Sequence, residues 1–479
     1  MTDSYPNWLS ERMIKGIKGF NLDAYLMALE GWRRGLTLTW YYDLSLVSDM
    51  KLVGYNPLAK SFSLTDKSTN QTHFFYRSRG DKVTNEAVDI VYQKDRAKES
   101  FQKANVSTPK GLVVDNATTN EEMIKAINKL NYPLVVKPTI GSLGKGVTTN
   151  IQNEKELFQA IENIKTRYEE YTRFIIEEHV VGQEYRVYVI ENEVVAVTKK
   201  EAVHVVGDGV HSIRQLVELK NNVREANPYL IRKLIKINEG TIHFLKRQNR
   251  DIEDIPEKGS IIQLNNNSNI SSGGDPVDAT DVLESQYKQL AIDAVRAIPN
   301  LNHAGVDIIV NEGKSTVLEV NATASIQMHL FPSKGKARNV PADIMNYYYP
   351  QSKKNATNNN DFYFNYKELR RILRKKQAQE ITIQDAPTEK FYKTRYIVSG
   401  KVQKVGYRNW IRKQAVKHNL NGYTRNLKNG NVVVVVGGIK KEAENFKKIC
   451  EKGPSKAKVE KVKELKWGYP IELGFEIRK

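Results

Sequence analysis

The stretch from Ala304 to Ala322, AGVDIIVNEGKSTVLEVNA, reads as two apolar strands joined by a tight turn. Runs rich in Val and Ile flank Asn311-Glu312-Gly313-Lys314, which is typical of an antiparallel β-hairpin that turns through its glycine. Side chains alternate between the two faces of a strand, so Glu319 and Asn321 share a face, and cross-strand pairing puts Asp307 roughly opposite them. Two carboxylates and an amide oxygen are therefore expected to converge.

This convergence predicts a metal site. Burying a carboxylate without a partner costs several kcal/mol, and nothing in an apolar strand pair offers that partner, whereas a hard cation would. Oxygen ligands without thiolate or imidazole favour Mg²⁺ or Mn²⁺ over zinc, and Mg²⁺ in such sites commonly joins carboxylates to nucleotide phosphates. We therefore expect Asp307, Glu319 and Asn321 to bind Mg²⁺ or Mn²⁺. The alternative is a surface hairpin whose acids are solvated.

Length and composition limit the class of protein. The 479 residues allow three or four domains. No apolar run approaches the roughly 18 residues of a membrane span, and the first residues lack a signal pattern, so we expect a cytoplasmic protein with no membrane partner. The single Cys450 excludes an internal disulfide framework and a cysteine metal cluster, and its surroundings indicate a helix core residue.

The net charge of +19 is concentrated near the C-terminus. Residues 389–479 hold 23 Lys and Arg against 8 Asp and Glu, a net +15, which leaves +4 for the preceding 388 residues. This region shows no dedicated series of aromatic residues for stacking bases, so an anionic small substrate explains the charge at least as well as RNA does. Nucleic acid is therefore not expected as the partner.

A glycine-rich loop follows a short apolar strand in the first half of the chain. The strand Tyr132–Lys137 ends in a lysine and leads into Gly141-Ser-Leu-Gly-Lys-Gly146. The exposed N–H groups of such a loop can fold over phosphates. It is not a Walker loop, because the one segment with the right ending, Gly313-Lys314-Ser315, has Ile308 in the place of the upstream glycine.

Two further segments suggest nucleotide and anion binding. Phe174–Arg186 reads as a strand, a bend and a second strand; backbone groups at such a bend can read an adenine edge, and Glu184 is placed to accept from ribose hydroxyls. The loop Asn267–Asp275 is polar, carries two glycines and leads towards a helix, which is typical of an anion clamp. A solvated loop explains this second segment equally well.

In their order and spacing, these pieces resemble the ATP-grasp carboxylate-amine ligases over residues 93–350. Val205–Gly209, Ser268–Gly274 and Met328–Pro332 narrow the resemblance to the ATP-grasp part of cyanophycin synthetases and bifunctional glutathione synthetases. The resemblance implies that Arg186 contacts the substrate or the acyl phosphate. It also implies ATP as cofactor, Mg²⁺ at the hairpin residues, and a nucleotide site formed by Lys98, Lys137, Ser142, Gly144, Gly146, Glu177, Glu178, Val180 and Glu184.

One position departs from this family. The relatives usually carry an arginine just ahead of the Asn-Ser-Asn-Ile-Ser loop, and this chain has Asn265 there. A preorganised cation of this kind is typically worth about 10² to 10³ in rate. Either Arg186 or Lys200 takes its place, or ligation is weakened.

The basic C-terminal module has a site of its own. Tyr396–Arg408 predicts a strand, a tight loop and the start of a helix, and the helix N-terminus with Arg408 makes an anion site. The region 391–479 resembles acylphosphatase, which implies that Arg408 binds phosphate and Asn426 orients the attacking water. Lys404 replaces the usual glycine and Tyr407 the usual phenylalanine; Lys404 would crowd the loop if its backbone needs positive φ.

We therefore predict a multidomain protein of α/β and α+β class. It comprises a small α/β leader (1–92), an ATP-grasp domain (93–350), a linker with a helix (351–388), and a ferredoxin-like βαββαβ acylphosphatase domain (389–479) with two helices on a four-stranded sheet. The oligomeric state is left open, with a homodimer as one option.

The predicted function joins both halves through one chemical species. An ATP-grasp ligase makes an acyl phosphate that an amine attacks, and acylphosphatase hydrolyses acyl phosphates. The first hypothesis is an amide-forming ligase acting on amino-acid or peptide carboxylates and amines, with a domain that clears unclaimed acyl phosphate. The second is an acylphosphatase whose ATP-grasp region only binds nucleotide as a regulator. A third is that the basic module binds RNA or another acidic polymer, which predicts a steep loss of affinity with salt.

Overall fold

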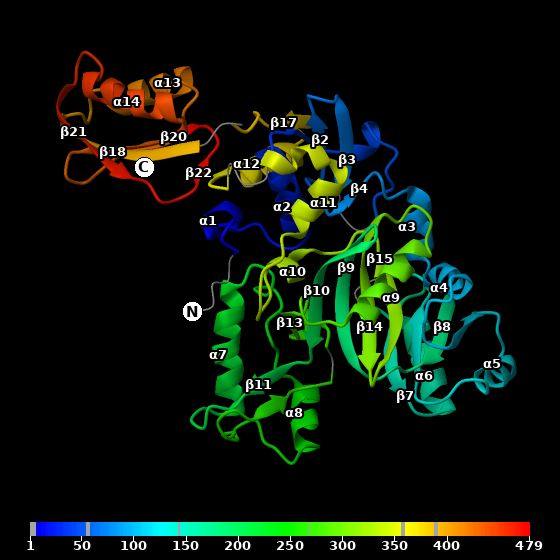
Figure 1. Cartoon of the computed structure of the whole chain (residues 1–479). Helices are drawn as coiled ribbons and strands as arrows, with labels where there is room; N and C mark the ends of the chain where they lie inside the picture. Colours follow the sequence, from blue (N-terminus) through cyan, green and yellow to red (C-terminus); the bar gives the residue numbers. More distant parts are fainter. Residues whose placement is uncertain (1–5, 54–57, 142–143, 267, 356–359, 388–390) are drawn as a thin grey trace. The chain divides into compact units, whose positions relative to one another are not determined.

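The computed structural model describes residues 6–53, 58–141, 144–266, 268–355, 360–387 and 391–479. The chain divides into two compact units (Figure 1). One is Arg79–Val340; the other joins the residues up to Ser78 with Pro341–Lys479. The beginning and the end of the sequence therefore share one unit, a pairing that local sequence patterns do not reveal.

The unit Arg79–Val340 contains a four-stranded and a five-stranded sheet among its described residues. The smaller sheet has the order β5-β8-β6-β7, and the larger β13-β10-β9-β14-β15. Strand β8 of one sheet is followed directly in sequence by β9 of the other, so the short bend between them links the two sheets. The predicted strand, bend and strand over 174–186 are confirmed, and the bend lies between two layers rather than within one.

Local sequence accounts for the main elements of this unit. Helix α6 covers the smaller sheet because Leu157, Ile161 and Ile164 lie on one face and pack with Phe174 of β8. Helix α7 begins after Ser212, whose capping box with Gln215 satisfies the first free N–H groups. The elements of the unit are β4 (Arg79–Gly80), α3 (Asn85–Tyr92), α4 (Lys94–Lys103), β5 (Gly111–Asp115), α5 (Asn120–Ile127), β6 (Leu134–Pro138), β7 (Thr148–Ile151), α6 (Glu154–Arg167), β8 (Arg173–Glu178), β9 (Gln183–Ile190), β10 (Glu193–Glu201), β11 (His204–Val206), α7 (Ile213–Ala226), α8 (Glu239–Lys246), β12 (Ile261–Gln263), η2 (Ile270–Ser272), β13 (Asp275–Asp278), α9 (Ser285–Arg296), β14 (His303–Asn311), β15 (Lys314–Asn321) and α10 (Gln327–Leu330).

The N-terminal residues fold with the segment 341–387. Strand β17, from the segment predicted as a linker, pairs antiparallel with β1 at Trp40 and Ile381. Trp32 of α2 packs against Phe362 and Phe364 of that segment. The segment therefore completes the leader's sheet and core instead of only connecting domains. The elements are α1 (Glu11–Ile14), α2 (Phe20–Arg33), β1 (Thr37–Tyr41), η1 (Leu44–Leu46), β2 (Ser61–Asp66), β3 (Gln71–Tyr76), α11 (Val340–Tyr348), η3 (Pro350–Asn355), β16 (Phe362–Tyr363), α12 (Tyr366–Arg374) and β17 (Glu380–Thr382).

The C-terminal module is a sheet with helices on one face. Its strand order is β21-β18-β20-β19-β23, so a fifth strand, β23, lies parallel to β19 beside the four predicted ones. Helices α13 and α14 cover one side (Figure 1), and Cys450 is buried there between them and the sheet, as predicted. The elements are β18 (Phe391–Lys401), α13 (Tyr407–Lys417), β19 (Asn421–Asn426), β20 (Val432–Ile439), α14 (Lys440–Lys452), β21 (Lys458–Lys466), β22 (Ile471–Glu472) and β23 (Phe475–Arg478).

A search of the described residues for a helix with the length and apolar character of a membrane span finds none.

Candidate active sites

The hairpin predicted from the sequence forms the edge of the five-stranded sheet. Strands β14 and β15 pair antiparallel with Asp307 directly opposite Glu319, and a bulge follows between Asp307 and Ile308. The turn passes through Gly313, whose φ of +80° is one that glycine adopts without strain. The Asn321 side-chain amide donates to the Glu319 carboxylate at 3.0 Å. The expected convergence of these side chains on one face is confirmed.

Two protein cations already partner Asp307. Arg186, its cross-strand neighbour on β9, donates through Nε and Nη2 at 2.7 and 2.6 Å, and the Lys200 ammonium lies 2.8 Å away. Burial alone would raise the pKa of Asp307, but these two charges outweigh it and hold that pKa well below its usual range. The premise that the strands offer this carboxylate no partner is therefore wrong, because β9 and β10 supply two.

The same network reaches the predicted ribose ligand. Lys200 also contacts Glu184, its neighbour across β9 and β10, and the Ser268 hydroxyl donates to the other oxygen of Glu184 at 2.5 Å. Arg186 and Lys200 were the candidates to replace the missing arginine at Asn265. Since both already share the charge of Asp307, neither is an uncommitted cation.

The oxygen donors of the hairpin fit a divalent cation. A carboxylate can accept about four hydrogen bonds or metal contacts on its two oxygens. Asp307 uses three of these positions for two nitrogens of Arg186 and one of Lys200, so one position remains for a metal ion. Glu319 is half-buried, and its Oε1 accepts from the Asn321 amide nitrogen, which leaves the amide oxygen as a donor to metal. The described residues contain no group of three or more His, Cys, Asp and Glu that would hold a metal. The roles of Asp307, Glu319 and Asn321 as Mg²⁺ or Mn²⁺ ligands remain a prediction.

A second charge cluster lies on the four-stranded sheet. The Glu177 carboxylate, 3% exposed, contacts Lys98 at 2.6 Å and Lys137 at 2.5 Å. Burial alone would raise the pKa of Glu177, but the lysine charges lower it below its ordinary value. The structure thus brings together three of the predicted nucleotide residues from α4, β6 and β8.

Lys94 is a member of this cluster that the sequence analysis missed. It lies four residues before Lys98 on helix α4, so both project from one face, and this spacing was the available signal. Its Nζ donates to the Gly141 carbonyl at 2.8 Å. Burial lowers the pKa of Lys94, and the charges of both Glu319 and Glu177 act on it. With three lysines around Glu177, the cluster carries a net positive charge suited to phosphates.

Other predicted nucleotide residues are placed differently. Glu178 accepts from the backbone and side-chain nitrogens of Asn131 at 3.0 and 2.9 Å, so its carboxylate is engaged away from the lysine cluster. Val180 lies in the bend between β8 and β9, half-buried. A nucleotide role for these two residues remains a prediction.

The glycine-rich loop is only partly described. Gly144 and Gly146 have φ of +72° and +68°, and a Cβ at Gly146 would lie 2.9 Å from the Pro138 ring. The backbone path and the close approach to Pro138 both require glycine at 146. Ser142, the predicted phosphate contact, lies outside the described residues.

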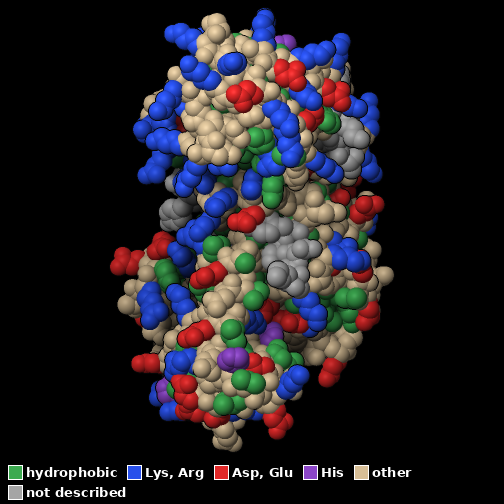
Figure 2. Space-filling view, turned by 90° about the vertical axis from the view of Figure 1, so that its left-hand side faces the viewer, with side chains coloured by type: hydrophobic (Ala, Val, Ile, Leu, Met, Phe, Trp, Pro, Cys, Tyr) green, Lys and Arg blue, Asp and Glu red, His purple; other side chains and the backbone are tan. Residues whose placement is uncertain are grey.

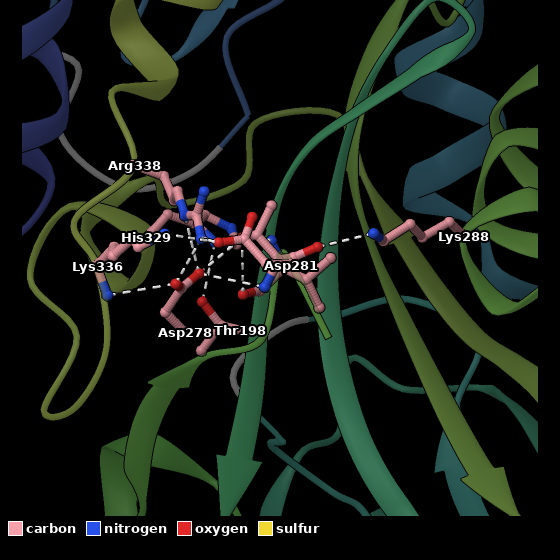
Figure 3. Close-up of polar contacts among 9 residues, drawn as sticks. Thr198, Asp278, Asp281, Lys288, His329, Lys336 and Arg338 are labelled. Atoms are coloured by element: carbon pink, nitrogen blue, oxygen red, sulfur yellow. Dashed lines mark hydrogen bonds and ion pairs between the residues drawn. The ribbon is translucent and has the colours of Figure 1, made fainter. Parts of the chain in front are cut away.

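A second polar cluster joins residues near β10 and β13 to the chain around α10, and Figure 3 shows its contacts. Arg338 donates to both oxygens of Asp278 at 3.0 and 2.7 Å and to Asp281 at 2.8 Å. On the neighbouring strand β10, the Thr198 hydroxyl lies 2.9 Å from the Nδ1 of His329, a residue of the Met328–Pro332 motif. Arg338 holds the chain after α10 against β13 and was not anticipated from the sequence.

Buried His329 predicts an acid-sensitive fold. Burial first, and then the charge of Arg186, lower the pKa of His329 to about 3, with Asp278 and Asp307 opposing. In the unfolded chain the pKa of this histidine is about 6.5. As the pH falls from about 6.5 towards 3, the unfolded state therefore binds a proton that the folded state does not bind. Stability falls across that window. The free energy of unfolding is expected to fall between pH 7 and pH 5, and His329→Gln should make this fall smaller by about 2 kcal/mol.

Urea denaturation at the two pH values measures this effect. The exposed His243→Gln is the matched control and should leave the pH dependence unchanged. The interpretation fails if His329→Gln and the unaltered protein lose equal stability between the two pH values.

The loop at Arg408 has the backbone of an anion cradle. Gly406 ends the loop in the left-handed region with φ +78°, and helix α13 begins at the next residue. The Gln403 side chain donates to the carbonyls of Leu427 and Asn431 at 2.8 Å each, which fixes the loop against the β19–β20 connection. Arg408 is half-buried in the first turn of the helix, and no described residue forms an ion pair with it. A phosphate would meet this guanidinium and the helix N-terminus together.

Asn426 ends strand β19 with an open acceptor. Its side-chain oxygen is shielded from bulk solvent and accepts no hydrogen bond from any described residue. A buried acceptor without a donor costs roughly 1–3 kcal/mol, so a hydrogen-bond donor such as an ordered water is expected there. The water-orienting role that the resemblance to acylphosphatase implies for Asn426 remains a prediction.

The backbone of Lys404 adopts a conformation that is unfavourable for a residue with a side chain. Its φ is +60°, a region that costs an L-residue roughly 1–2 kcal/mol. Lys404→Gly is therefore expected to stabilise the protein by about 1 kcal/mol. Gly406→Ala should destabilise it by a similar amount through the backbone alone, since no atom lies within 4 Å of the added Cβ. Thermal denaturation measures both, and an unchanged Tm for Lys404→Gly would show that the loop carries no such strain.

Family comparisons identify two kinds of domain in the chain. Residues 92–206 match a RimK-like ATP-grasp domain, residues 197–324 match an ATP-grasp domain, and residues 394–477 match acylphosphatase. The chain therefore carries ATP-grasp domains followed by a C-terminal acylphosphatase domain, and both are domains of enzymes.

Particular relatives cover its ATP-grasp part. The chain is 34% identical over 232 residues to the bifunctional glutathione biosynthesis protein of Enterococcus faecalis, covering 46% of this chain and 30% of the relative. It is 30% identical over 279 residues to cyanophycin synthetase of Crocosphaera subtropica, covering 55% and 31%. The chain thus spans about a third of the length of these relatives.

Solved structures resemble each part. The bifunctional glutathione synthetase from Pasteurella multocida matches with 29% identity and a TM-score of 0.48, covering 63% of this chain and 41% of that one. An acylphosphatase from Coxiella burnetii matches with 30% identity and a TM-score of 0.18, covering 18% of this chain and 93% of that one.

Proposed function

We propose that the protein is an ATP-dependent ligase that joins an amino-acid or peptide carboxylate to an amine through an acyl phosphate. The observation that carries this proposal is the lysine cluster around buried Glu177, linked electrostatically through Lys94 to the oxygen donors of the β14–β15 hairpin. A polyphosphate and a divalent ion need such neighbouring cationic and anionic surfaces.

The lysines would bind and orient the nucleotide. Lys98 and Lys137 each face Glu177, which holds their ammonium groups in place and keeps them from repelling one another. On binding, phosphate oxygens would share these donors, and Lys94 would add a third from the same helix. When bound, Mg²⁺ at Asp307, Glu319 and Asn321 would neutralise phosphate charge.

The ligation proceeds by two displacements. A carboxylate oxygen of the substrate attacks the γ-phosphorus of ATP. The bond between the γ-phosphorus and the oxygen that bridges it to the β-phosphate breaks, and ADP leaves with that oxygen. The amine then attacks the acyl carbon, loses a proton, and expels phosphate. Arg186 and Lys200 would lower the cost of the developing negative charge, but only to the extent that Asp307 releases them.

The C-terminal domain would hydrolyse acyl phosphates. Arg408 and the N–H groups at the start of α13 hold the phosphoryl group, and the free oxygen of Asn426 accepts a hydrogen bond from water and aims it at phosphorus. The bond between phosphorus and the acyl oxygen breaks, releasing carboxylate and phosphate. In a protein that also carries the ligase, this hydrolysis would remove acyl phosphate that has not reacted with an amine. The amine must attack the acyl phosphate before this intermediate reaches the C-terminal domain, because hydrolysis of the intermediate would consume ATP without forming an amide.

Asn265 favours a second candidate function. Relatives usually carry arginine there, and the two candidate substitutes, Arg186 and Lys200, both pair with Asp307. The ATP-grasp domain would then bind nucleotide without ligating and regulate the hydrolase.

One screen separates these two functions. The purified protein is incubated with ATP, Mg²⁺ and free amino acids, singly and in pairs, while ADP release and new amides are followed. ADP release that requires both amino acids, with an amide of matching mass, supports the ligase. Nucleotide binding without any substrate-dependent ADP release supports the regulator.

A further inference from the structure

The C-terminal sheet has a second face that neither proposed reaction uses. Tyr396 and Val398 of β18 point into the helix-covered core, so the alternating Arg395 lies on the opposite face. Tyr423 and Arg425 of β19 flank Thr424, which points into the interior, and share that face. The face opposite the helices is thus basic and aromatic.

A cavity of about 360 Å³ lies on this face. Its lining includes three aromatic rings, from Tyr423, Trp467 and Tyr469. Trp467 lies 6.1 Å from Tyr423 and 5.2 Å from Tyr469, both edge to face. No dedicated aromatic series is apparent in the sequence of this module, yet folding brings three rings together from β19 and the segment after β21.

Guanidinium groups surround these rings. Arg478 stacks over Tyr423 at 4.0 Å, and Arg395 lies 5.9 Å from the Trp467 ring centre. Arg425 also lines the cavity, and so does Arg12 of helix α1 in the same unit. Arg478 also donates through Nε to Glu476, so only its remaining N–H groups are available for phosphate oxygens. No acidic side chain appears among the described residues that line this cavity.

Two of the residues that line the cavity each carry a buried donor that lacks an acceptor. Nε of Arg395 and Nε1 of Trp467 are shielded from solvent, and neither donates to any described residue. Leaving a buried donor unpaired costs roughly 1–3 kcal/mol, which a ligand oxygen would recover. These donors are an observation independent of the charge, and they also indicate an oxyanion.

We propose that this face binds single-stranded nucleic acid, with a base stacked among Tyr423, Trp467 and Tyr469 and a backbone phosphate held by Arg395 and Arg425. Aromatic rings on an open sheet stack bases that a duplex keeps covered. A second hollow, whose lining includes Glu472, shares Tyr423, Trp467 and Arg478 with the first.

The charge of the domain favours a strand over a free nucleotide. The domain holds 23 Lys and Arg against 8 Asp and Glu, and Figure 2 shows blue side chains gathered over the upper part of that view. A phosphate backbone gains from many dispersed cations, whereas a single nucleotide gains only from those lining one cavity. The inference stands independently of both proposed reactions.

Fluorescence anisotropy of the full-length protein with a labelled single-stranded RNA of about 12 nucleotides tests the proposal. Trp467→Ala and Arg425→Ala are each expected to weaken binding about tenfold. Arg425→Ala should also reduce the dependence of log affinity on log salt by about one. Trp467→Phe should retain most of the affinity, because a ring remains for stacking. Arg425 is exposed, so its replacement does not endanger folding.

Arg412→Ala is the matched control, since it removes an exposed arginine from α13 in the same domain. It should weaken binding less than about twofold. Equal losses for Arg412→Ala and Arg425→Ala would overturn the proposal in favour of diffuse electrostatic attraction. Competition by AMP or inorganic phosphate at the same phosphate concentration, or equal affinity for the duplex, would also overturn it. Far-UV circular dichroism and the thermal denaturation midpoint of each variant, which depend on neither proposed reaction, confirm that its domain is folded.

Discussion

Arg408→Ala is expected to reduce acyl phosphate hydrolysis by about 10³-fold. Arg408 lies in the first turn of α13, two residues after the left-handed Gly406, so we expect its guanidinium and the helix N–H groups to bind the same phosphoryl group. Removing the side chain leaves the N–H groups but takes away a preorganised, charge-assisted donor. Hydrolysis of acetyl phosphate, followed by phosphate release, measures the loss.

The control for this prediction again uses Arg412→Ala, which removes a solvent-exposed arginine from the same helix. It should retain hydrolysis. ADP release by the ATP-grasp domain should be unchanged in Arg408→Ala, while Lys137→Ala should lose ADP release and keep hydrolysis. If Arg408→Ala reduced both activities equally, the two centres would not be independent.

Asp307→Ala is expected to cost about 3 to 5 kcal/mol of folding stability. The carboxylate is 4% exposed and is the partner of both Arg186 and Lys200, so its loss leaves two buried cations with less compensation. Without Asp307, Lys200 would still form its ion pair with Glu184, whereas no other carboxylate among the described residues forms an ion pair with Arg186. The midpoint of urea denaturation measures the change.

Glu319→Gln separates the metal role from the structural one. Glu319 is half-buried and accepts from Asn321, a bond that an amide oxygen preserves. Its stability should therefore stay within about 1 kcal/mol of the unaltered protein, while Mg²⁺-dependent ADP release falls about 10²-fold or more. A Glu319→Gln protein that keeps full ADP release would remove the hairpin from the metal site.

Much of the site was accessible from the sequence because its signals are local. The hairpin follows from two apolar runs around a glycine, and strand alternation then places Glu319 and Asn321 together. The replacement of the usual glycine by Lys404 raised the question of a positive φ there, and the structure gives a φ of +60°. Lys94 was missed, although its spacing from Lys98 on one helix predicts a shared face.

Other features depend on partners that are distant in sequence. Arg186 and Lys200 neutralise Asp307 only because β9 lies between β10 and β14, and no local pattern specifies that strand order. The role of residues 380–382 as an edge strand depends in the same way on β1, which precedes them by more than 300 residues.

The sequence by itself predicted the ATP-grasp and acylphosphatase domains and the oxygen-bearing hairpin, because each has signals in residues close together in the chain; the phosphate roles of the glycine loop and of Arg408 remain predictions. Only the tertiary structure decided which charges neutralise one another and which faces they leave open. Tyr423 and Trp467 are 44 positions apart, and their rings come within 6.1 Å only when the sheet forms. Cooperative packing sets such contacts, since each depends on the order and register of strands that pair across long separations.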